Sequence, residues 1–68
     1  MKTFNDLMNE KGFNGNQLSI ASGVAVMTVN DLKKGKTHFK KVNVETALKL
    51  SKALNMSVEE IYKYLYQA

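Results

Sequence analysis

NGNQLSIASGVAVMTVNDLKKG, residues 14–35, predicts two short helices joined by a tight turn. Asn14 and Gln17 have the N-x-x-Q spacing of a capping box, in which each side chain binds a free backbone N–H at the start of the first helix. Gly23 follows that helix, at a place where a left-handed backbone conformation turns the chain sharply and glycine adopts it without steric strain. The second helix is expected to begin near Val26 and to end at Gly35.

Apolar residues in this stretch recur at helical spacing or line the turn. They are Leu18, Ala21, Val24, Val29 and Leu32, with Ile20 on the flank. Two helices that cross through a short glycine turn meet the structural requirement for presenting the second helix to a groove of DNA. The stretch therefore predicts a helix-turn-helix.

The chain resembles the Cro/C1-type (XRE) helix-turn-helix domains of lambdoid phage repressors. The matching positions are Leu18, Ala21, Gly23, Val24, Thr28, Val29, Leu32 and Gly35. The likeness continues through GKT at residues 35–37 and VEEIYKYL at residues 58–65, so it covers essentially all 68 residues. It implies an all-α, compact five-helix bundle of the lambda-repressor-like type, in which the second and third helices form the helix-turn-helix.

The remaining helices are indicated by their caps and their apolar spacing. The expected caps are Thr3 with Asp6 and Gly12 for the first helix, Asn43 and Asn55 for the fourth, and Ser57 with Glu60 for the fifth. The residues expected to face the core are Phe4, Leu7, Met8, Val44, Ala47, Leu48, Leu50, Ser51, Leu54, Ile61 and Leu65. Phe39 is expected to anchor the connection between the third and fourth helices.

Length and composition limit the class of protein. Residues 1–68 are expected to form one domain with a small core, because a chain of this size buries only about 60% of its unfolded surface. Without cysteine there is neither a disulfide nor a thiolate zinc site. No apolar stretch approaches the roughly 18 residues that span a membrane, and the N-terminal sequence predicts a capped helix rather than a signal peptide. We expect a cytoplasmic, nucleoid-associated protein without a membrane partner.

The basic residues are concentrated after the third helix. Five of the ten lysines lie within residues 33–41, which contain no acidic residue. In the resembling repressors the loop after the recognition helix holds the sugar-phosphate backbone, and such contacts fix orientation without selecting bases. The resulting phosphate-binding candidates are Lys34, Lys36, Thr37, His38, Lys40 and Lys41, joined by Asn14, Asn16 and Gln17 at the start of the second helix.

The third helix turns Val29 and Leu32 toward the core, so its opposite face would enter a major groove. The base-facing candidates are Val26, Met27, Thr28, Asn30 and Asp31. Asn30 has the best chemistry for a direct base contact, because an amide binds adenine bidentately; the alternative is a solvated helix residue. Val26 and Met27 replace the polar residues usual in the resembling repressors, and they suit either thymine methyl groups or a protein partner.

The other candidates on this helix carry alternatives of their own. Asp31 either accepts a hydrogen bond from cytosine N4 or pairs with Lys34 three residues on, and we favour the ion pair. Thr28 is expected to be half-buried, with its hydroxyl toward the second helix or a phosphate. The chain has no arginine, so the bidentate contact of arginine with guanine is missing and weaker base discrimination, or reading of A·T shape, is expected.

No reaction chemistry is indicated. One histidine, no cysteine and six scattered acids provide no triad, metal cluster or carboxylate pair, so we expect no enzyme, cofactor, metal or small-molecule substrate. Tyr64, Leu65 and Tyr66 are candidate contacts of a homodimer; the alternative is that the tyrosines cover the core. The sequence thus predicts a DNA-binding transcriptional regulator, phage or bacterial and most simply a repressor, that occupies operator-like double-stranded DNA. The alternative is a helix-turn-helix fold used for protein binding, as in an antitoxin-like or antirepressor-like partner.

Overall fold

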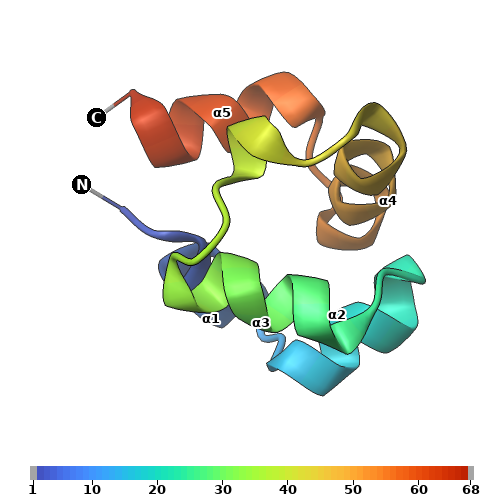
Figure 1. Cartoon of the computed structure of the whole chain (residues 1–68). Coiled ribbons are helices and arrows are strands. Elements are labelled where there is room, and N and C mark those ends of the chain that lie inside the picture. The colour runs from blue at the N-terminus through green and yellow to red at the C-terminus, as the bar shows by residue number, and fades with distance from the viewer. Residues whose placement is uncertain (1, 68) are drawn as a thin grey trace.

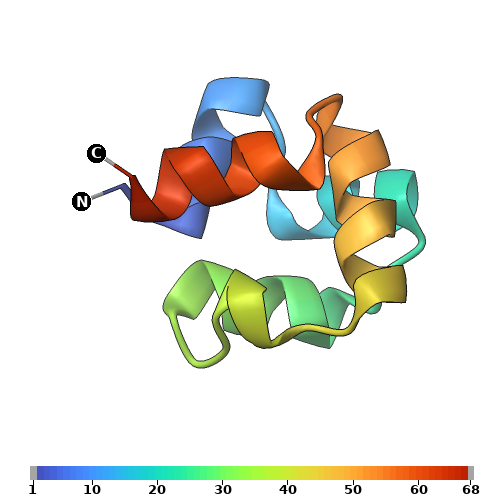
Figure 2. The ribbon, with the colours of Figure 1, turned by 90° about the horizontal axis from the view of Figure 1, so that it is seen from above.

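The computed structural model describes residues 2–67, and this part of the chain forms helices without a strand (Figure 1). The elements are α1 (Phe4–Lys11), α2 (Gly15–Ser22), α3 (Val26–Lys34), the 3₁₀ turn η1 (Phe39–Lys41), α4 (Val44–Leu54) and α5 (Val58–Tyr66). Figures 1 and 2 show α3 and α5 running in a similar direction on opposite sides of the molecule, with α4 crossing at one end. The predicted all-α bundle of five helices is confirmed.

Local hydrogen bonds explain why the helices begin at these residues. Asn14 Oδ1 accepts from the N–H of Gln17 at 2.8 Å, and Gln17 Oε1 accepts from the N–H of Asn14 at 3.0 Å. Thr3 and Ser57 begin capping boxes of the same kind, and Asn43 caps α4. The expected caps of these four helices are therefore confirmed.

The turn between α2 and α3 is held differently, because the N-cap residue of α3 is Ala25 and its side chain makes no capping bond. Gly23 has φ 77°, as expected for the left-handed turn. The hydroxyl of Ser19 donates to the carbonyl of Val24 at 2.7 Å, and the N–H of Val24 donates to the hydroxyl of Ser22 at 3.1 Å. The hydroxyls of Ser19 and Ser22 thus bind both backbone groups of Val24, a role that the sequence pattern did not indicate.

One hydrophobic cluster joins the helices. Its buried members are Phe4, Leu7, Met8, Leu18, Val24, Val29, Leu32, Phe39, Ala47, Leu50, Leu54, Ile61 and Leu65. The expectation that Phe39 anchors its loop is confirmed. This residue is 2% exposed, and its ring stacks on that of Phe4 with 6.3 Å between the ring centroids.

Some residues expected in the core lie on the surface. Val44 is 74% exposed and Leu48 is 49% exposed, because the buried face of α4 is centred on Ala47, Leu50, Ser51 and Leu54 and is rotated away from them. Ala21 is also exposed, and Ile20 is 83% exposed, because α2 directs Leu18 inward. The expected core role of Val44 and Leu48 was wrong, and of the two apolar residues Leu18 and Ala21 on α2 only Leu18 is buried.

Candidate nucleic-acid interface

Helix α3 separates a buried face from an outer face. Val29 and Leu32 are 0% and 3% exposed and fix the inner face. Among the base-facing candidates, Val26 is 40% exposed and Met27 is 73% exposed. The other three candidates, Thr28, Asn30 and Asp31, are half-buried. The outer face is therefore apolar at its N-terminal end and polar in its middle.

Asn30 lies against the first turn of α2. Gly15 is buried there, and a Cβ placed on it would lie only 2.6 Å from Asn30 Oδ1. Real Cβ contacts are not that short, so the amide occupies the space that a side chain at residue 15 would need. Sequence reasoning missed this packing. The available signal was a glycine at the first position of a helix, where the resembling repressors often carry glutamine.

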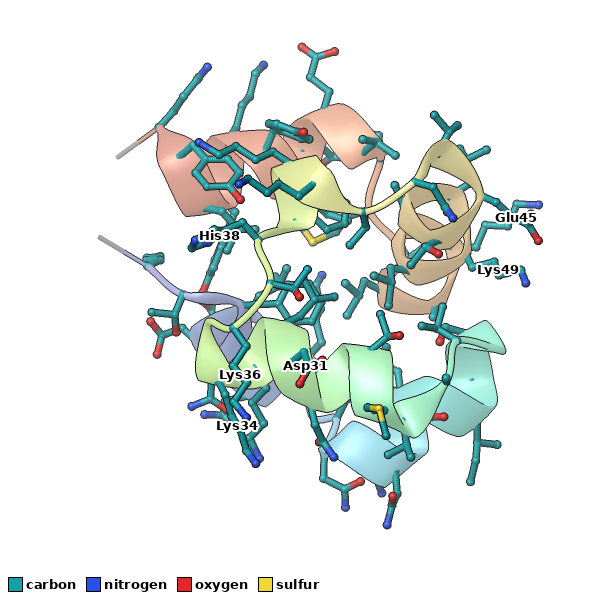
Figure 3. All side chains as sticks on the ribbon, viewed as in Figure 1. Asp31, Lys34, Lys36, His38, Glu45 and Lys49 are labelled. Atoms are coloured by element: carbon teal, nitrogen blue, oxygen red, sulfur yellow. The ribbon has the colours of Figure 1, made fainter. Side chains whose placement is uncertain are left out.

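Asp31 does not form the ion pair that we expected. Within residues 2–67 the ion pairs are Lys2–Glu10, Lys49–Glu45 and Lys63–Glu59. Figure 3 shows the Lys34 side chain extending away from Asp31. An exposed pair at this spacing gains only about 0.2–0.5 kcal/mol, which does not outweigh the freedom of a long lysine side chain. The Asp31 carboxylate is thus left without a basic partner in the described structure.

The backbone of Asp31 positions the basic loop instead. Its carbonyl accepts from the N–H of Lys36 at 2.9 Å and from the N–H of Thr37 at 3.3 Å. The N–H of Lys41 donates to the carbonyl of His38 at 2.8 Å and closes η1. Figure 3 shows Lys34, Lys36 and His38 at the C-terminal end of α3 and in the loop that follows.

The phosphate-binding candidates share solvent access. The exposed ones are Asn14, Asn16, Gln17, Lys34, Lys36, His38, Lys40 and Lys41, and Thr37 is half-buried. The side-chain oxygens of Asn14 and Gln17 are engaged in their capping box, which leaves the amide NH₂ groups as donors. The first N–H groups of a helix have no intrahelical partner, so the start of α2 adds donors beside these side chains.

The C-terminal tyrosines contact other residues of the same chain. The Tyr64 hydroxyl donates to Glu10, and this bond with the nearby carboxylate charge raises the pKa of Tyr64 to about 12. The N–H of Lys40 donates to the Tyr66 hydroxyl at 3.4 Å. The Tyr62 ring packs edge-on against the Phe39 ring, with 5.5 Å between the ring centroids. Leu65 is 5% exposed, so of the three dimer candidates it is a core residue, whereas Tyr66 is 38% exposed.

Comparison with known proteins identifies the type of domain. Searches among curated proteins and among solved structures returned no match. No helix in residues 2–67 is long and apolar enough to span a membrane. The family model for the Cro/C1-type HTH DNA-binding domain matches residues 3–65, which include α1 to α4 and all of α5 except its last residue, Tyr66. The chain therefore belongs to the family of Cro/C1-type HTH DNA-binding domains.

Proposed function

We propose that the chain is a sequence-specific transcriptional repressor, of phage or bacterial type, that places α3 in the major groove of an operator-like site. The observation that carries the proposal is the position of the exposed lysines in the last turn of α3 and in the loop that follows, within residues 33–41, which contain no acid. Positive charge beside a helix with an exposed outer face suits the phosphate backbone that borders a groove. Repression then follows from occupation of the DNA site itself.

In this proposal Lys34, Lys36, Lys40 and Lys41, with Thr37 and His38, hold phosphates on one side of the groove. The first turn of α2, with Asn14, Asn16 and Gln17, holds a phosphate on the other side. Two observations support this assignment. Most of these side chains are exposed, and the loop is held by hydrogen bonds from the N–H groups of Lys36 and Thr37 to the Asp31 carbonyl.

A second copy of the chain completes the proposed complex on DNA. A two-fold dimer sets two recognition helices about 34–36 Å apart, one turn of DNA. Of the three C-terminal candidates for such a contact, Tyr66 is exposed and Tyr64 is half-buried, whereas Leu65 is buried. Sedimentation with and without DNA tests this, and strictly one chain per selected site would contradict it.

The experiment that tests DNA binding is an anisotropy titration of labelled duplexes over a range of salt concentrations. Affinity should fall with a log–log slope of about 0.9 per neutralised phosphate. Lys36→Ala and Lys41→Ala should each reduce the slope by about 0.9 per bound chain and weaken binding to all sequences alike. Lys52→Ala, an exposed lysine on α4, is the matched control and should leave the slope unchanged. A salt-independent affinity would refute the proposal.

A protein-binding role is the second candidate, and the exposure of Ile20 and Met27 favours it. These side chains are 83% and 73% exposed, and exposed apolar residues can mark protein interfaces. The expected partner would resemble that of an antitoxin or antirepressor. Met27→Gln distinguishes the roles, because it should change the preferred DNA site if Met27 faces bases and should leave DNA binding intact if it faces a protein.

A further inference from the structure

The outer face of α3 combines an apolar surface with a carboxylate. Met27 and Asp31 are one helical turn apart, a spacing that brings Cβ atoms to about 5–6 Å. Val26 lies beside Met27, and both are exposed. Asp31 has no basic partner among the ion pairs of residues 2–67. A base edge that meets this face therefore encounters a hydrogen-bond acceptor next to methyl and methylene groups.

The amide of Asn30 is not part of this surface. Its Oδ1 is seated over Gly15, at the start of α2, so the side chain is directed toward the neighbouring helix. Thr28 is half-buried, and its hydroxyl both donates and accepts, so it does not select one base. Of the five base-facing candidates, Val26, Met27 and Asp31 therefore remain as the selective groups.

Only part of the DNA code complements such a surface. In the major groove cytosine donates from N4 and presents no acceptor. Adenine donates from N6 but places its N7 acceptor beside that donor, and guanine presents two acceptors that repel a carboxylate. Thymine presents its C5 methyl group, which packs against apolar side chains. We propose that α3 selects a pyrimidine edge, in which Asp31 accepts from cytosine N4 and Met27 with Val26 contacts an adjacent C5 methyl group. This inference rests on the proposed function, since it requires α3 to enter the major groove.

The methyl group has two sources, a neighbouring thymine or the cytosine itself when it is 5-methylated. 5-Methylcytosine carries the N4 donor and the C5 methyl on one edge. Guanine or thymine opposite Asp31 is disfavoured as well, because the carboxylate then meets only acceptors and gains no compensating bond. Specificity in this chain thus arises from repulsion of wrong sites together with attraction to the right one.

The test begins with selection of binding sites from a random duplex library by the full chain. The selected site is then synthesised with deoxyuridine in place of thymidine, or with 5-methylcytosine in place of cytosine. Loss of one contacting methyl group should weaken binding about fourfold. Weakening by deoxyuridine assigns the methyl group to thymine, and tighter binding to the 5-methylcytosine duplex assigns it to the methylated base; either result supports the proposal.

Two variants link these effects to residues. Met27→Ala should abolish the response to the missing or added methyl group, whereas Leu48→Ala, which removes an exposed apolar side chain from α4, should preserve it. Asp31→Ala removes the acceptor and should reduce the preference for cytosine about tenfold, while affinity for random DNA rises because a negative charge is removed. Glu59→Gln makes the same charge change on α5 and should leave the cytosine preference intact.

The outcomes separate this inference from the proposed function. Selected sites without cytosine, or an Asp31→Ala variant with the cytosine preference of the parent, would overturn the pyrimidine assignment while sequence-specific binding stands. A library from which no sequence is enriched would overturn both. Met27 is exposed and Asp31 is only half-buried, so circular dichroism should confirm that both variants fold.

Discussion

Gly15→Ala tests the contact between α2 and α3, because the contact decides whether the substitution raises or lowers the free energy of unfolding. Alanine is favoured over glycine within a helix by about 0.5–1 kcal/mol. In this fold, however, the new Cβ would lie 2.6 Å from Asn30 Oδ1, so the amide must leave its position. Overpacking in proteins costs about 1–3 kcal/mol, and the end of a short side chain that can rotate belongs at the low end of that range. The two terms oppose each other, and we expect the variant to be neutral or destabilised by up to about 1 kcal/mol.

The same substitution should become stabilising once Asn30 is shortened. In an Asn30→Ala background the Cβ of residue 15 meets no amide oxygen, so the helix preference of alanine, about 0.5–1 kcal/mol, should appear in full. The measurement is a double-mutant cycle of unfolding free energies from urea titrations followed by circular dichroism. A coupling energy of about 1 kcal/mol is expected, within the range found for residues in contact.

Additivity would refute this reasoning. If Gly15→Ala stabilises the parent and the Asn30→Ala protein equally, the amide does not occupy the space over residue 15. Asn16→Ala provides the matched control, because this neighbouring side chain is exposed. Its effect should add to that of Asn30→Ala within about 0.3–0.5 kcal/mol. Site selection with the Gly15→Ala protein supplies a second readout, since an amide displaced into the groove should introduce a preference for adenine.

Three further predictions follow from the packing and the hydrogen bonds. Phe39→Ala should lower the unfolding free energy by about 3–5 kcal/mol, measured by urea titration, because the ring is buried; a loss below about 1 kcal/mol would contradict its anchoring role. Hydrogen bonds from Ser57 lower the pKa of Glu60 below 4.5, so their stabilisation is present above pH 4.5 and is lost as the pH falls through the lowered value. Glu60→Gln, which removes the titrating carboxyl group, should therefore flatten the acid limb of the stability profile, and an unchanged limb would exclude this linkage. Glu10→Gln should bring the pKa of Tyr64 down from about 12 toward 10.0 in an absorbance titration, whereas a titration unaltered by the change would show that Glu10 does not hold the hydroxyl.

The features that sequence reasoning predicted correctly depend on residues close together in the chain. The capping boxes at Asn14 and Ser57 join residues three apart, so their spacing alone determines the geometry. The left-handed turn at Gly23 is equally local. Val44 and Leu48 were misassigned because both lie near the apolar stripe of α4, and the rotation of that helix is set by packing with other elements. The spacing of apolar residues indicates that a helix is amphipathic. It does not decide whether the residues at the edge of the apolar stripe are buried or exposed.

The recognition face depends on the longest-range information and was therefore the least predictable part. Whether Asn30 points to a base or to α2 is decided by how closely two helices approach, and Gly15 permits that approach by lacking a side chain. Likewise, the Asp31–Lys34 spacing allows an ion pair, but the weak gain from an exposed pair does not impose one. Both outcomes change the groups that the outer face of α3 presents. The Asn30 amide is directed toward α2, and the Asp31 carboxylate stays accessible to a ligand without a lysine to neutralise it. If α3 enters the groove, the bases it selects are consequently determined as much by the packing of α2 against α3 as by the sequence of α3 itself.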